Sequence, residues 1–78
     1  MYQIIRLELN RDGEIVARRA LQPLFELWED AMALSEFDAT RCGDDYGYDE
    51  EHEGWWVFGA GRSYRFVVEQ VVATDIAA

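Results

Sequence analysis

Residues 23–38 carry the helical periodicity that most constrains how this chain can fold. At about 100° per residue, their apolar side chains fall on one stripe of a helical wheel and their acidic side chains fall opposite it. Pro23 suits the first turn of a helix, because its φ is already helical and no hydrogen bond needs its nitrogen. We therefore predict one amphipathic helix over 23–38. Its buried stripe comprises Leu24, Leu27, Trp28, Ala31 and Leu34, widened by Phe25 and Met32.

The residues before this helix are typical of a β-hairpin over 2–21. Residues 2–9 alternate between two faces as a half-buried strand does, and the Asn-Arg-Asp-Gly sequence of 10–13 supplies turn residues. The alternation also predicts how the two strands align. The expected pairs are Leu9 with Ile15, Leu7 with Ala17, and Arg6 with Arg18.

The second half of the chain predicts a loop and another hairpin. Residues 39–54 lose periodicity and are rich in Gly, Asp and Glu, so we expect a long acidic loop with a short helical turn at 49–53. A β-hairpin over 55–73 follows, joined through the glycine-rich segment 59–63, and 74–78 is expected to be a frayed tail. Trp56 and Phe58 are assigned to the buried face of this hairpin, which leaves Trp55 and Val57 outside.

These segments define the expected fold class. The order is ββαββ in one small α+β domain: a four-stranded antiparallel sheet with the helix across one face. With 78 residues the chain has room for one core. Cys42 is the only cysteine, so no internal disulfide can form, and no stretch has the pattern of a secretory leader or a membrane span. We therefore expect a cytoplasmic protein.

The charge is concentrated in the middle of the chain. Sixteen acidic residues face seven arginines and no lysine, for a net charge of −9. Residues 22–54 hold eleven of the acids and only one base, Arg41. A field of this sign repels nucleic acid and anionic membranes and attracts basic surfaces. We therefore predict neither direct nucleic-acid binding nor membrane binding, and a basic protein surface as partner.

The sequence gives little support for catalysis or a cofactor. Aligning Gly47 with the glycine of an EF-hand loop puts Cys42 at the first ligand position, which breaks the calcium-binding pattern. His52 is the only histidine, so a transition-metal site lacks ligands, and no oxyanion motif accompanies Ser35, Ser63 or Cys42 as a nucleophile. We predict a protein that is not an enzyme and has no cofactor and no metal site. A small metal-binding protein remains an alternative.

The acidic helix face carries the functional hypothesis. Carboxylates on a rigid helix, continued by an acidic loop, can occupy a groove that otherwise holds nucleic-acid phosphates. We predict a protein-binding inhibitor of the nucleic-acid-mimic type, similar in size and charge to phage and mobile-element counter-defence proteins such as anti-restriction and anti-CRISPR inhibitors. The alternative is an antitoxin-like or accessory module that binds through strand edges and the face of Trp55, and a homodimer is left open. The predicted partner-binding residues are Glu26, Glu29, Asp30, Glu36, Asp44, Asp45, Asp49, Glu50, Glu51 and Glu53, with Trp55 as apolar anchor.

Overall fold

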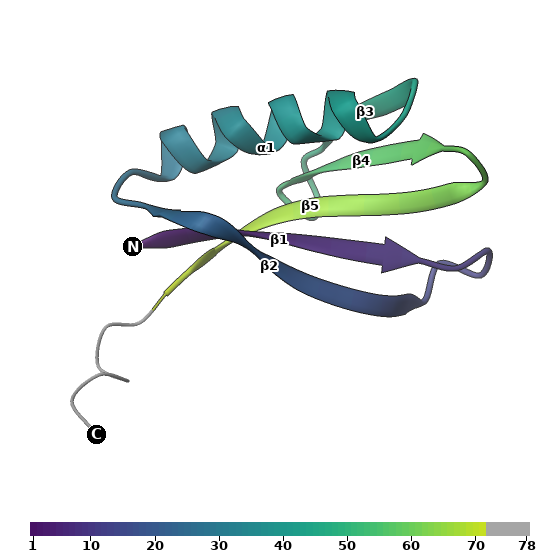
Figure 1. The fold of residues 1–78 in the computed structure, drawn as a ribbon, viewed down its shortest axis with the longest axis horizontal. Coiled ribbons are helices and arrows are strands. Elements are labelled where there is room, and N and C mark those ends of the chain that lie inside the picture. The colour runs from purple at the N-terminus through teal and green to yellow at the C-terminus, as the bar shows by residue number, and fades with distance from the viewer. Residues whose placement is uncertain (72–78) are drawn as a thin grey trace.

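A computed structural model describes residues 1–71; the predicted tail at 74–78 and the last two residues of the predicted second hairpin lie outside the described residues. Within 1–71, one helix lies across one face of a five-stranded antiparallel sheet (Figure 1). The predicted α+β class is confirmed, but the four strands and the ββαββ order are wrong, because the predicted acidic loop contains a further strand. The elements are β1 (Tyr2–Leu9), β2 (Ile15–Phe25), α1 (Trp28–Cys42), β3 (Asp45–Asp49), β4 (Gly54–Gly59) and β5 (Arg62–Gln70).

The strand order β2-β1-β5-β4-β3 places β1 and β5 at the centre and leaves β2 and β3 as the two edges. On β1, Ile4 lies opposite Leu21 of β2 and Val68 of β5, and all three belong to the core beneath α1. The next residue, Ile5, points to the other side of the sheet, because side chains alternate along a strand. We call that other side the open face, since no described helix or strand covers it (Figure 1), although Ile5 at its centre is only 2% exposed.

Small side chains bring α1 close to the sheet. Ala31, Ser35 and Ala39 are spaced four residues apart, so they share one side of the helix, and all three are fully buried. They lie over the largest fully buried side chain, Phe66 of β5. The Ser35 hydroxyl donates to the carbonyl of Met32 at 2.7 Å, so its burial leaves no unpaired polar group.

The predicted helix start is wrong, and the predicted buried stripe is right only in part: Ala31 is fully buried and Leu34 packs against the core. Pro23 lies within β2, and the helix begins five residues later at Trp28. A proline without an N–H is tolerated in β2 because this is an edge strand. Leu27 and Trp28, both assigned to the buried stripe, are 57% and 40% exposed. The helix also extends past 38 to include Arg41, so a base belongs to the element whose outer side was expected to be purely acidic.

The predicted acidic loop is also partly wrong. Residues 45–49 form β3, which pairs with β4 and places Gly47 opposite Trp56 and Tyr48 opposite Trp55. The rings of Tyr48 and Trp55 meet edge to face, with centroids 5.3 Å apart. The segment 50–53, expected to be helical, is the turn that connects β3 to β4.

The face assignment of β4 is reversed relative to the prediction, and the cause is its turn. Ala60 and Gly61 both have positive φ, 53° and 74°, as in a tight two-residue hairpin turn. This turn pairs Phe58 with Ser63 and Trp55 with Phe66. Trp55 and Val57 therefore face α1, whereas Trp56 and Phe58 lie on the open face.

The first hairpin follows the predicted pairing only near its turn. Leu9 pairs with Ile15 as expected. An irregularity between Glu8 and Leu9 then shifts β2, so Leu7 pairs with Arg18 and Arg6 pairs with Arg19. An extra residue in one strand produces such a shift, which alternation alone does not reveal.

Enlarging the buried side of α1 should destabilise the fold. We expect Ala39→Leu to lower the free energy of unfolding by about 1–3 kcal/mol, because three extra carbons have no room against the sheet. Ala33→Leu on the exposed side of the same helix is the matched control and should change it by less than about 0.5 kcal/mol. Urea unfolding followed by circular dichroism measures both. Equal effects would contradict the close helix–sheet packing.

Candidate functional site

The predicted partner-binding carboxylates lie on or next to two neighbouring elements, α1 and β3, which contact each other. We call them the acidic set: Glu26 before α1; Glu29, Asp30 and Glu36 on α1; Asp44 and Asp45 at the start of β3; Asp49 at its end; and Glu50, Glu51 and Glu53 in the turn. All except Asp49 are exposed. Glu29 and Asp30 also lie in the first turn of α1, where the helix dipole favours negative charge.

Most of the acidic set has no arginine partner among residues 1–71. Among residues 1–71, Arg18 pairs with Glu69 at 2.6 Å, which lies outside the set, and Arg65 lies 4.0 Å from Asp49. Arg41, the single arginine of residues 22–54, lies over the ring of Phe37 at 5.6 Å. The negative charge of the acidic set is therefore not neutralised by ion pairs within the described chain, apart from that of Asp49.

The structure exchanges the predicted roles of the two adjacent tryptophans. Trp55, proposed as the exposed anchor, packs against the core, and its indole Nε1 is buried without a hydrogen-bond partner. Trp56 lies on the open face and is 36% exposed. Phe58 beside it is 52% exposed, and Ile15 at the far edge is 58% exposed. The apolar surface that the sequence assigned to Trp55 is therefore on the open face.

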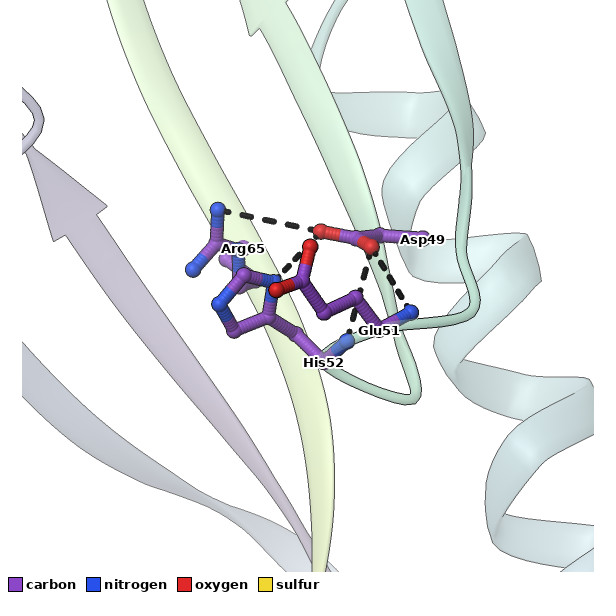
Figure 2. A network of polar contacts seen from close by, with 4 residues as sticks. All are labelled: Asp49, Glu51, His52 and Arg65. Carbon is purple, nitrogen blue, oxygen red and sulfur yellow. Dashed lines mark hydrogen bonds and ion pairs between the residues drawn. The ribbon is translucent and has the colours of Figure 1, made fainter.

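Asp49 is the centre of a polar network at the end of β3 (Figure 2). Its carboxylate accepts the backbone N–H groups of Glu51 and His52 at 3.0 and 3.4 Å, and it accepts the ring Nδ1–H of His52 at 2.7 Å. Arg65 approaches from β5. The hydrogen bond from His52 is the main cause that holds the pKa of Asp49 below its ordinary value. Asp49 therefore shapes the turn and is less free for a partner than its neighbours.

The same network is the place where a metal ion would bind, if the chain held one. Donor atoms of Asp49, Glu51 and His52 lie within 4.8 Å of one another. The arrangement favours an ion-paired turn instead, because the Asp49 oxygen already accepts from His52 and the Arg65 guanidinium adds positive charge beside it. This geometry gives the metal-binding alternative little support.

Comparison of the chain with protein families, with curated proteins and with solved structures finds no match. Functional inference therefore depends on the chemistry of the described surface. Within residues 1–71, no helix is long and apolar enough to cross a membrane.

Two features of the surface were missed from the sequence. The first is the strand β3 itself, whose Asp-Tyr-Gly-Tyr-Asp alternation is a strand signal hidden in a glycine-rich acidic segment. The second is the exposure of Trp56, which depends on the two-residue turn at 60–61. An alternative hairpin alignment with a shorter loop would have revealed it.

The His52–Asp49 hydrogen bond predicts how Asp49 titrates. Its pKa should lie below the ordinary 3.8, because the hydrogen bond stabilises the carboxylate. A depressed pKa contributes stability above 3.8, and that contribution is lost as the pH falls through the lowered value. In carboxyl-carbon NMR titrations, His52→Ala should raise the Asp49 pKa towards 3.8, and the neighbouring Glu50→Gln should leave it unchanged. An Asp49 pKa unaffected by His52→Ala would contradict the network.

Proposed function

We propose that this protein is a non-enzymatic inhibitor that binds a basic, nucleic-acid-binding surface of another protein, in the manner of a nucleic-acid mimic. The observation that supports the proposal is the acidic set, because nine of its ten carboxylates are exposed and lack an arginine partner among residues 1–71. Phage or mobile-element counter-defence, of the anti-CRISPR or anti-restriction kind, is the context in which such an inhibitor acts, and the protein works in the cytoplasm.

Electrostatics supports a partner rather than a solvated surface. Uncompensated like charges on adjacent elements repel one another and destabilise a small domain. Surface acids that serve solubility alone are typically interspersed with bases, which reduces that repulsion. Contact with lysine and arginine side chains would relieve it and would steer the partner to the acidic set. The carboxylates of α1 and of β3 extend this attraction along two elements.

The open face favours a second candidate function, an antitoxin-like or accessory interaction module. Trp56 and Phe58 lie next to each other across the sheet from α1, and both are more than a third exposed. Exposed aromatic side chains gathered on one face often mark a protein contact. A module of this kind would bind with little dependence on salt, which separates it from the first proposal.

Neutralising the helix acids should weaken capture of the partner. We expect the immobilised protein to retain nucleic-acid-binding proteins from an extract of its native cells at low salt, and to release them as the salt rises. The triple variant Glu29→Gln, Asp30→Asn, Glu36→Gln should release them at lower salt, and added DNA should compete with capture. Mass spectrometry of the eluted fractions identifies the proteins.

A matched control removes the same charge elsewhere. The triple variant Glu8→Gln, Asp12→Asn, Glu14→Gln changes three acids of the first hairpin, outside the acidic set. It should elute close to the unmodified protein. Capture that persists at high salt, or that both variants weaken equally, would contradict binding through the acidic set.

A further inference from the structure

The outer edge of β3 combines three features that suit the binding of an extended peptide. It is an end strand of the sheet and pairs only with β4. Its exposed side chains are acidic or aromatic: Asp45 lies on the open face, and Tyr46 and Tyr48, which are 44% and 41% exposed, lie on the other. The ring of Trp56 extends over it. An edge strand presents unpaired N–H and C=O groups that can bind another strand.

Gly47 shows how far Trp56 reaches. A Cβ added to Gly47 would lie 2.7 Å from Cζ2 of Trp56 and 2.9 Å from its Nε1. The indole ring therefore covers Gly47 on the open face, in the position that a side chain of β3 would otherwise fill. A strand placed alongside β3 would meet this ring between Asp45 and Asp49.

We infer that β3 accepts an extended, arginine- or lysine-rich segment of the partner as a sixth strand. This inference rests on the proposed function, since it assigns the part of the basic partner that is bound. Side chains of an added strand alternate between the two faces, so every second one lies on the open face. There, basic side chains would meet the carboxylate of Asp45 and the face of Trp56, which attracts cations. On the other face the added strand contacts Tyr46 and Tyr48.

Charge favours a segment of a partner protein over β2 of a second copy as the strand that is added to β3. β2 offers one arginine to each face, because Arg18 and Arg19 are adjacent. Arg18 is already paired with Glu69 at 2.6 Å. A partner segment with a base at every second position would place several bases on the open face beside β3, where β2 would place only Arg18. Backbone hydrogen bonds supply affinity in strand addition, and the side chains supply the selection.

The probe is a fluorescent seven-residue peptide that alternates valine and arginine, measured by anisotropy at low salt. The control peptide has the same sequence but is N-methylated at every peptide bond, so it keeps the charge and cannot donate to β3. We expect the control to bind about tenfold more weakly. Amide hydrogen exchange should slow in β3 when the unmethylated peptide binds, and should stay unchanged in α1.

Two protein variants locate the contact. Asp45→Lys on β3 and Asp12→Lys in the turn of the first hairpin change the net charge equally, and both positions are exposed. We expect Asp45→Lys to weaken peptide binding about tenfold and Asp12→Lys, which lies outside the acidic set, less than about threefold, because only the first lies beside the added strand. Each variant's circular dichroism spectrum and urea midpoint check that it is folded. If Asp45→Lys does not fold, Trp56→Phe, which keeps a smaller ring, takes its place and should weaken binding at least threefold.

The outcomes separate this inference from the proposed function. Equal binding of both peptides without slowed exchange in β3 would overturn strand addition, while salt-dependent capture of basic proteins would still support the acidic set. No binding of the unmethylated peptide would also overturn strand addition. Slowed exchange in β3 that depends on protein concentration, without peptide, would show that a second copy occupies the edge and would overturn it too. Loss of capture from the extract as well would overturn both.

Discussion

The close approach of α1 to the sheet is the constraint on which the rest of the structure depends. The side of α1 that faces the sheet carries the small residues Ala31, Ser35 and Ala39, so the helix backbone lies close to the sheet. The side chain of Phe66 fills the space beneath them. The same closeness recurs at the end of the helix, where a Cβ on Gly59 would lie 2.7 Å from the Cα of Gly43. Large side chains are therefore excluded from the positions of Ala31, Ser35 and Ala39, while Leu34 of the same helix packs partly buried against the core.

That exclusion explains why the surface is rich in aromatic residues. Trp28 and Phe37 belong to α1 but are 40% and 55% exposed, because the sheet-facing positions are taken by small residues. Arg41 lies over Phe37 and shields part of its ring. On the sheet, a single helix covers one face only, so Trp56 and Phe58 remain at the surface of the other. The exposed apolar surface thus follows from this packing.

The sequence predicts the class of the fold better than it predicts the pairing of the strands and the ends of the elements. The first hairpin, the helix and the last hairpin are each found from their periodicity, and Leu9 pairs with Ile15 as expected. The errors in the helix start and in the pairing of the two hairpins share a cause: each is a shift of one or a few residues that periodicity does not determine. Pro23 fits either a helix start or an edge strand, and the second depends on strand order.

The candidate site shows the same limit. Residue type was enough to find the exposed carboxylates, because acids without partners remain at the surface. It was not enough to place Asp49, whose pairing with Arg65 joins two strands that are distant in the sequence. Nor could it separate Trp55 from Trp56, since adjacent strand residues exchange faces when the turn changes by one residue.

The two edges of the sheet carry opposite charge, and this bears on what can bind them. β2 holds Arg18 and Arg19, whereas β3 begins and ends with Asp45 and Asp49. Pairing of either edge with its own copy would bring like charges together, which disfavours it. Since Glu69 already pairs with Arg18, the basic edge is partly neutralised, while Asp45 has no such partner within the described chain. Each edge therefore keeps one charge without an ion pair among residues 1–71, Arg19 on β2 and Asp45 on β3, and only Asp45 is accompanied by the other exposed carboxylates of the acidic set.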